Sequence, residues 1–228
     1  IVTATDLSTW MPRPRPGSVM LTGTTVRLEP LDWAAHEQGL FAVVGGKENA
    51  RLWDHVSVGP YVDQATFQND LEQTRVARGW EAMVIHDSVS NVILGMFSFM
   101  RIREQHGSVE IGCVVFGYTL QRTSKATEGL LLMARHVFDD LGYRRYEWKC
   151  DDQNKASVRA AKRFGFLYEG TFRNDSVSKG RNRDTAWFSI TDGEWPSVRA
   201  GLDAWLTPQN FDADGTQIKT LEEVRGPR

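Results

Sequence analysis

The chain carries one strand, helix, strand unit that constrains its fold more than any other segment. The apolar run Val109–Phe116 is typical of a strand, and after a short turn apolar residues recur at helical spacing up to Gly142, a residue type that often ends helices. The strand-like run Arg145–Cys150 follows at once. Two parallel strands need a connection of about a dozen residues or more, which this helix supplies. The pattern therefore predicts a parallel strand pair within the sheet.

The remaining segments predict a mixed α/β (α+β) fold with a mostly antiparallel central sheet and helices on both faces. A first strand is expected around Val26–Leu31, and two apolar runs joined by the polar turn 87–91 should form a hairpin. The predicted helices are Trp33–Val44, Asp63–Arg78, Asn154–Phe164 and Trp195–Leu206, and the further strands are Trp80–His86, Val92–Ile102, Leu167–Arg173 and Thr185–Thr191.

The 228 residues are 41% hydrophobic, which suits one well-buried domain with extensions. Residues 1–23 include the proline-rich stretch Met11–Gly17 and are expected to form an extended arm. The folded domain is predicted to span residues 24–206, and the polar residues 207–228 are predicted to form a loop-like tail.

Charge and cysteine content narrow the possible functions. The net charge is −2, but residues 119–183 hold 14 Lys and Arg against 8 Asp and Glu, a local excess that suits a small phosphorylated ligand better than a nucleic-acid groove. Cys113 and Cys150 show no metal-ligand spacing, and no two of the five histidines have the spacing of a helical metal site. With no long apolar run or signal-peptide core, we expect a cytoplasmic protein without metal, membrane or nucleic-acid partners.

The turn Leu120–Glu128 has the composition of an anion-binding site. Thr123 or Ser124 can cap the helix that follows, the first amides of that helix have no helical acceptor, and Arg122 and Lys125 add positive charge. The alternative is an ordinary capped helix whose basic residues are only solvated. Taken alone, the turn favours the ordinary capped helix.

A second motif favours the anion site. Asn154 and Ser157 stand three residues apart at the start of the next helix, an arrangement that is equally compatible with a structural cap. In combination and in this order, the two motifs resemble the GNAT superfamily of acyl-CoA-dependent N-acetyltransferases, and most closely the branch of the ribosomal-protein N-terminal alanine acetyltransferases. The resemblance covers roughly residues 24–195 and is carried by Gln121–Ala126, Ala126–Glu128, Arg163–Phe166, Glu169–Gly170 and Gly180–Trp187.

This resemblance implies acetyl-CoA as the cosubstrate, released as coenzyme A. Its pyrophosphate would lie on the amides of residues 122–127, and its pantetheine arm along residues 114–118, where the strand is implied to splay from the one after the helix. The implied cofactor-binding residues are Val114, Phe116, Gln121, Arg122, Thr123, Ser124, Lys125, Ala126, Thr127, Asn154 and Ser157.

Amine acetylation needs a proton acceptor, because amines are protonated at neutral pH. The candidate bases are Glu110, Asp175 and Asp184, with Glu110 ranked first, although Glu110 on an alternating strand could equally face solvent. The amide of Phe116 or a neighbour is the candidate donor to the thioester oxygen. The chain departs from the family in having Ser124 where glycine is usual and Ala161 where many members carry tyrosine, so Ser157, Tyr118 or water would protonate the leaving thiolate.

The acceptor is expected to be a primary amine, on a small molecule or on a protein N-terminus, bound by a monomer or homodimer. The candidate substrate-binding residues are Trp53, His55, Tyr118 and Trp187, although such aromatic residues more often belong to the core. A non-catalytic acyl-CoA-binding or sensing module is the alternative function. A nucleic-acid-binding domain is a third interpretation, but the chain lacks a motif of that type.

Overall fold

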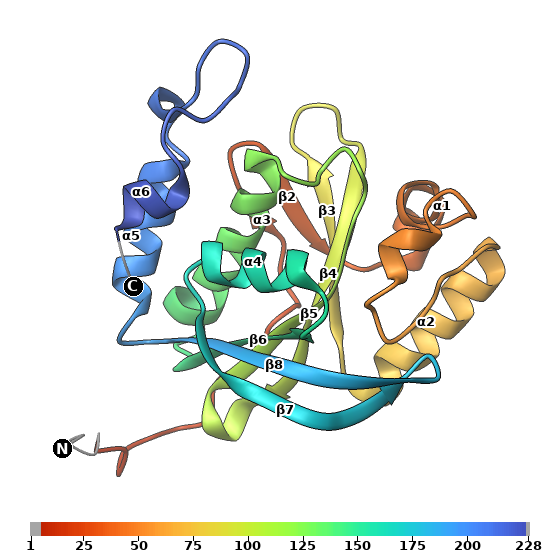
Figure 1. Ribbon diagram of the computed structural model, residues 1–228, viewed down its shortest axis with the longest axis horizontal. Coiled ribbons are helices and arrows are strands. Elements are labelled where there is room, and N and C mark those ends of the chain that lie inside the picture. The colour runs from red at the N-terminus through yellow and green to blue at the C-terminus, as the bar shows by residue number, and fades with distance from the viewer. Residues whose placement is uncertain (1–5, 227–228) are drawn as a thin grey trace.

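The computed structural model describes residues 6–226, which form an eight-stranded sheet in the order β1-β2-β3-β4-β5-β6-β8-β7 (Figure 1). Neighbouring strands in this sheet run antiparallel, apart from the parallel pair β5 and β6. The mixed, mostly antiparallel sheet predicted from the sequence is therefore confirmed. The strands are β1 Leu21–Thr22, β2 Val26–Pro30, β3 Glu81–Asp87, β4 Ile93–Arg103, β5 Ser108–Phe116, β6 Arg145–Asp151, β7 Leu167–Ser178 and β8 Arg181–Thr191.

Helices cover both faces of the sheet, as predicted. On one face α1 and α2 enclose a core that includes Trp53 and Phe67, and on the other α3, α4 and α5 enclose a larger core that includes Phe97 and Trp148 (Figure 1). Strands β3, β4 and β5 contribute apolar residues to both cores, because successive side chains of a strand point to opposite faces of the sheet. The helices are α1 Trp33–Val44, α2 Gln64–Arg78, α3 Ser124–Arg135, α4 Lys155–Arg163, α5 Trp195–Trp205 and α6 Leu221–Arg225, with a π-helical turn His136–Asp140 after α3.

Strands β5 and β6 separate halfway along their length. Their parallel pairing runs from Ser108 opposite Arg145 to Ile111 opposite Trp148 and then stops, although β5 continues to Phe116. Beyond that point β5 has a bulge at Cys113, whose φ of 45° is rare for a residue other than glycine. The backbone edge of β5 beyond Ile111 is therefore not paired with β6, and the region where the two strands diverge is called the cleft below.

The hairpin of β7 and β8 is longer than the sequence predicted. The residues 174–184 were expected to connect two short strands, but they extend both strands to a two-residue turn at Lys179 and Gly180. Both turn residues have positive φ, as tight hairpins require. The exposed, polar sequence of the hairpin lacks the apolar alternation that signals a strand, which explains the shorter prediction.

Residues 6–23, which belong to the arm predicted from the proline-rich sequence, lie against the body of the protein. The Trp10 indole donates to the carbonyl of Gln105, Arg15 forms ion pairs with Glu81 and Glu104, and Leu21–Thr22 add the edge strand β1. Residues 1–5, also assigned to this arm, lie outside the described residues. The arm therefore contributes packing and pairing, and is not a free extension over residues 6–23.

The C-terminal residues differ from the loop-like tail that the sequence predicted. A 3-10 turn, Pro208–Asn210, leads to α6, which packs on α5 and buries Leu221. The Arg225 guanidinium donates to the carbonyl of Arg163 at the end of α4 (2.6 Å), where a cation is favoured by the helix dipole. Residues 227–228 of the predicted tail lie outside the described residues. Among residues 6–226, no helix is both long and apolar enough to cross a membrane.

The docked tail predicts a measurable contribution to stability. Leu221→Ala should lower the free energy of unfolding by about 2–4 kcal/mol, because a fully buried leucine in the larger core would leave a cavity. Ile218→Ala is the matched control in the same segment: Ile218 is 64% exposed, so its change should stay within about 0.5 kcal/mol. Urea denaturation of both variants measures the difference, and equal effects would contradict the docking.

Candidate active site

The turn before α3 presents a group of free backbone donors. Thr123 caps the helix: its hydroxyl oxygen accepts from the amide of Ala126 (3.2 Å) and its proton goes to the carbonyl of Leu120 (2.7 Å). Across residues 6–226, the amides of Arg122, Ser124 and Lys125 have no hydrogen-bond acceptor. Arg122 has a φ of 62°, which marks the tight turn that aligns these amides.

The side chains around this turn have distinct roles. Arg122 is exposed, whereas Lys125 pairs with Asp87 at the end of β3, and this ammonium group is the main reason that the pKa of Asp87 lies far below its usual value. Lys125 therefore anchors the turn to the β3–β4 hairpin. Gln121 donates from its side-chain amide to the carbonyl of Phe116 (3.0 Å), which ties the turn to the end of β5.

Helix α4 lies on the other side of the cleft and begins with the predicted cap. The Asn154 side chain accepts from the amide of Ser157 (3.0 Å), which leaves the Asn154 amide group as a donor. The Ser157 hydroxyl oxygen accepts the indole proton of Trp148 (2.9 Å), and the same hydroxyl lies within hydrogen-bonding reach of the Cys150 thiol. Ala161 on the same helix is fully buried, and its side chain provides no proton donor.

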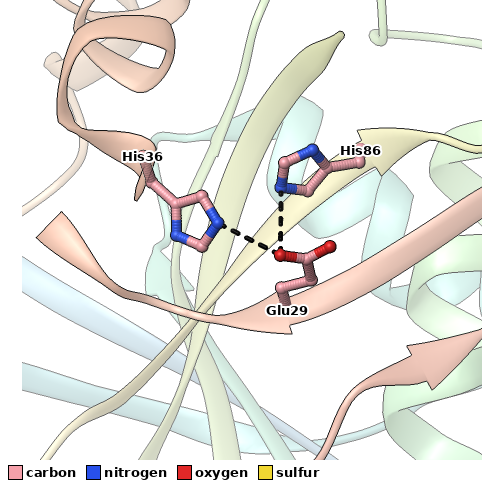
Figure 2. Close-up of side chains that lie close together, drawn as sticks. All are labelled: Glu29, His36 and His86. Carbon is pink, nitrogen blue, oxygen red and sulfur yellow. Dashed lines mark hydrogen bonds and ion pairs between the residues drawn. The ribbon is translucent and has the colours of Figure 1, made fainter. Parts of the chain in front are cut away.

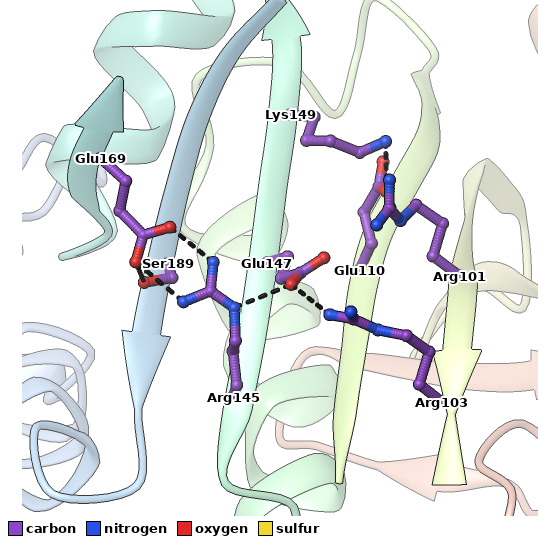
Figure 3. A network of polar contacts seen from close by, with 8 residues as sticks. All are labelled: Arg101, Arg103, Glu110, Arg145, Glu147, Lys149, Glu169 and Ser189. Atoms are coloured by element: carbon purple, nitrogen blue, oxygen red, sulfur yellow. Dashed lines mark hydrogen bonds and ion pairs between the residues drawn. The ribbon is translucent and has the colours of Figure 1, made fainter. Parts of the chain in front are cut away.

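Glu110 is buried on β5 just before the strands diverge, and two cations face it (Figure 3). Lys149 Nζ lies 2.9 Å from Glu110 Oε2, and Arg101 Nε lies 3.9 Å from the same oxygen. Burial raises the pKa of the Glu110 carboxyl, and the charges of Lys149 and Arg101 oppose that rise. A carboxylate with a raised pKa at the base of a cleft suits proton transfer.

The other two candidate bases lie on the β7–β8 hairpin. Asp175 is exposed and accepts from the Thr185 hydroxyl (2.7 Å). Asp184 accepts from the amide of Asn174 (2.7 Å) and from the side chain of Asn182 (2.9 Å), and the Asn174 amide is the main cause of its lowered pKa. Both carboxylates stabilise the hairpin, and a lowered pKa makes Asp184 a poor proton acceptor.

The four aromatic and histidine residues predicted to bind substrate lie in different environments. Trp53 is fully buried, where its indole donates to the carbonyl of Val44 (2.7 Å), so its ring has no surface for a substrate. His55 lies 3.6 Å from Asp151 across the cleft, and Tyr118 is exposed. Trp187 lies beneath two cations: Arg101 Cζ and Lys149 Nζ are 4.9 Å and 4.8 Å from the centroid of its ring.

Comparison with known proteins identifies the family. Residues 26–167, more than half of the chain, match the acetyltransferase (GNAT) domain. The chain belongs to the GNAT acetyltransferase family. A GCN5-related N-acetyltransferase from Brucella melitensis is 42% identical, with 96% of this chain and 99% of that chain covered and a TM-score of 0.91.

Two further structures of GNAT proteins resemble this chain. A GNAT-family protein from Chromobacterium violaceum is 38% identical over 86% of this chain and 98% of its own, with a TM-score of 0.79. An acetyltransferase from Salmonella typhimurium, described as modifying the N-terminal serine of a 50S ribosomal subunit protein, shares the fold at 22% identity over 76% of this chain and 99% of its own, with a TM-score of 0.65. The resemblance drawn from the sequence motifs is thereby confirmed.

The GNAT site contains a charged network that the sequence analysis did not identify. Arg145, Glu147 and Lys149 project from the same face of β6, and Arg101 and Arg103 reach toward them from β4 (Figure 3). Within each strand these charged residues are two positions apart, and this spacing could have predicted that they share a face, because alternate residues of a strand point to the same side. Which strands would be neighbours could not be read from local sequence. The network is completed by Glu110, Glu169 and Ser189.

A second polar cluster in this GNAT domain joins Glu29, His36 and His86 (Figure 2). His36 Nδ1 accepts from the amide of Asp32 (3.0 Å), so a neutral His36 carries its proton on Nε2 and donates it to Glu29 (3.2 Å). The Arg27 guanidinium occupies the other Glu29 oxygen (2.6 Å). A metal ion would have to displace the Nε2 proton, so we assign the cluster to the packing of α1 on β2 and β3.

Proposed function

We propose that this GNAT domain transfers an acetyl group from acetyl-CoA to a primary amine by direct attack within a ternary complex. The observation that carries the proposal is the divergence of β5 and β6 beyond Ile111 and Trp148. The unpaired end of β5 leads along the chain from the buried carboxylate of Glu110 to the free amides before α3. One strand edge therefore joins the proposed diphosphate site to the proposed proton acceptor.

The residues present fit acetyl-CoA. The amides of Arg122, Ser124 and Lys125 are suited to phosphate oxygens at a helix start, and the unpaired edge of β5 over Val114–Phe116 can accept a pantetheine arm as an added strand. The Asn154 side-chain amide is a further donor on the opposite wall. The thioester supplies an activated acetyl group and a good leaving thiolate.

Direct transfer is favoured over an acyl-cysteine route. A cysteine attacks as the thiolate, but burial raises the pKa of the Cys113 thiol to about 12 and also raises the pKa of Cys150. Both thiols would remain protonated near neutral pH. The acceptor amine is therefore the attacking group, and Glu110, directly or through water, takes its proton. The Ser157 hydroxyl is the side-chain donor proposed to return a proton to the departing thiolate.

A non-catalytic acyl-CoA-binding module is the second candidate. It is motivated by the buried Ala161, which provides no acid where many relatives carry tyrosine, and by Ser124 in a turn that usually has glycine. In that case the cleft would bind acetyl-CoA without turnover. The presence of Glu110 at the base of the cleft favours the enzyme.

Release of free thiol from acetyl-CoA tests the proposal. Purified protein with acetyl-CoA and a panel of primary amines, including peptides, amino acids and polyamines, should release coenzyme A in an amine-dependent reaction and give an acetylated product by mass spectrometry. Calorimetry with coenzyme A is the matched binding measurement. Binding without turnover on any amine would support the binding module, and neither binding nor turnover would contradict both functions.

A further inference from the structure

A charged groove lies on the sheet face beside Glu110. It has a volume of about 320 Å³ and crosses from β4 over β6 to β7 and β8. Its lining is Arg101, Arg103, Arg145, Glu147, Glu169, Gly170, Phe172 and Trp187. Arg101 belongs both to this groove and to the surroundings of Glu110. An acceptor whose amine reaches Glu110 would therefore leave its remaining atoms in this groove.

The carboxylates of the groove are already engaged by cations (Figure 3). Glu147 accepts from Arg103 (2.7 Å) and from Arg145 (2.7 Å). Glu169 accepts two hydrogen bonds from Arg145 (2.8 and 2.5 Å) and one from the Ser189 hydroxyl (2.7 Å). A polycationic acceptor would have to displace these contacts, which bidentate geometry makes strong.

Arg101 is the cation of the groove that is least committed. Its Nε lies 3.9 Å from Glu110, too far for a hydrogen bond, while its guanidinium lies over the Trp187 ring and its side chain is 42% exposed. The guanidinium keeps its planar set of donors available, and that set matches a carboxylate. Arg103 is similarly exposed, but it is more committed than Arg101 because its guanidinium donates a hydrogen bond to Glu147.

The backbone holds Arg101 in this position. Arg101 has a φ of 45°, in the left-handed region that residues other than glycine rarely adopt, and the pairing of β4 with β5 shifts between Met100 and Arg103. Such a bulge redirects a side chain and carries backbone strain, which is commonly found at functional sites. Here the bulge lies in the strand next to Glu110.

Resting on the proposed acetyl transfer, we infer that the acceptor is a primary amine that also carries a carboxylate, and that Arg101 is the specificity-determining residue that binds it. The lining holds three arginines against two paired carboxylates, which leaves the groove with surplus donors and an excess positive charge. An acidic peptide or an amino acid would complement this surface. A linear polyamine would be repelled by it.

The test compares acceptors that share one amine. The purified enzyme is assayed with acetyl-CoA and tetrapeptide amides of sequence Ser-Glu-Glu-Trp, Ser-Gln-Gln-Trp and Ser-Lys-Lys-Trp, with a free acidic amino acid, and with a linear polyamine. We expect kcat/KM for the acidic peptide to exceed that for the basic peptide by about tenfold or more. The assay with the free acidic amino acid distinguishes a small-molecule acceptor from a peptide acceptor. A higher kcat/KM for the acidic peptide than for the basic one, or for the acidic amino acid than for the polyamine, supports the inference.

Variants of Arg101 assign the preference to this residue. Arg101→Glu should lower kcat/KM for the acidic peptide and raise it for the basic peptide, and the milder Arg101→Gln should reduce the preference without reversal. Arg199→Gln is the matched control: Arg199 is 45% exposed and pairs with Asp139 in the turn after α3 and with Asp203 on α5, so the preference should not change. A wild-type preference for the basic peptide or the polyamine, or an unchanged preference in both Arg101 variants, would overturn this inference and leave the proposed acetyl transfer intact. No acetylation of any amine would overturn both.

Discussion

Glu110→Gln is expected to lower kcat/KM for amine acetylation by about 10²–10⁴-fold, the range typical of general bases. Glutamine keeps the size of the side chain and an oxygen for Lys149, so the buried site should remain packed. What it removes is the proton acceptor at the base of the cleft. Steady-state kinetics with the best amine of the panel measures the loss, and calorimetry with coenzyme A should show unchanged binding.

The pH dependence gives this prediction a second measurement. Glu110 accepts a proton only as a carboxylate, so the rate should fall as the pH drops through its pKa. Because burial raises that pKa, the fall should begin above the usual range for a carboxyl group. Lys149→Met removes the nearest positive charge that lowers the pKa of Glu110, so the loss of rate should occur at still higher pH. In Glu110→Gln this pH-dependent loss of rate should be absent.

Asp184→Asn is the matched control for Glu110→Gln. Its carboxylate is also a sequence-derived candidate base, but it is held by hydrogen bonds within the β7–β8 hairpin. We expect its kcat/KM to stay within about threefold of the wild type, because the asparagine oxygen can still accept from the Asn174 amide. A large loss in Asp184→Asn together with a small loss in Glu110→Gln would reassign the base.

The elements that the sequence predicted well are those whose signals are local. Helix α2 begins after the Asp63 cap, whose side chain accepts from the amide of Thr66, and ends at Gly79 in the left-handed conformation. The crossover from β5 through α3 to β6 follows from the apolar period of the helix and the length of the connection. Each of these signals lies within about thirty residues of chain, so no knowledge of tertiary contacts is needed.

The elements that were predicted poorly depend on contacts between distant residues. Arg15 is held by Glu81 and Glu104, and Arg225 by the end of α4, so neither terminal segment is an extension in the described structure. Trp53 shows the same limit in the site. It was a candidate for substrate contact, but the long-range packing of α1 and α2 buries its ring.

The candidate site shows a similar division. The turn before α3 could be read from composition and order alone, because caps and free amides are properties of a helix start. Glu110 was ranked first among three carboxylates by its position before this turn. Its partners could not be foreseen, because Lys149 and Arg101 reach it from two neighbouring strands whose order depends on the whole topology.

Ser124→Asp is expected to weaken binding of coenzyme A by about 100-fold while leaving the protein as stable as the wild type or slightly more stable. Ser124 is the first residue of α3, where a negative charge interacts favourably with the helix dipole, typically by 0.3–1 kcal/mol. The same charge would stand beside the amides that we propose to bind the diphosphate, and would repel it. The change therefore separates the stability of the helix from its proposed use as an anion site.

Calorimetry with coenzyme A and thermal unfolding without it are the two measurements for this prediction. Ser124→Gly is the matched control, because it restores the residue usual in this family at the turn and adds no charge; its affinity for coenzyme A should equal or exceed that of the wild type. Raising the salt concentration should reduce the difference in affinity for coenzyme A between Ser124→Asp and Ser124→Gly, because the repulsion is electrostatic. If Ser124→Asp bound coenzyme A as tightly as the wild type, the diphosphate could not lie on these amides, and the cleft between β5 and β6 would need another ligand.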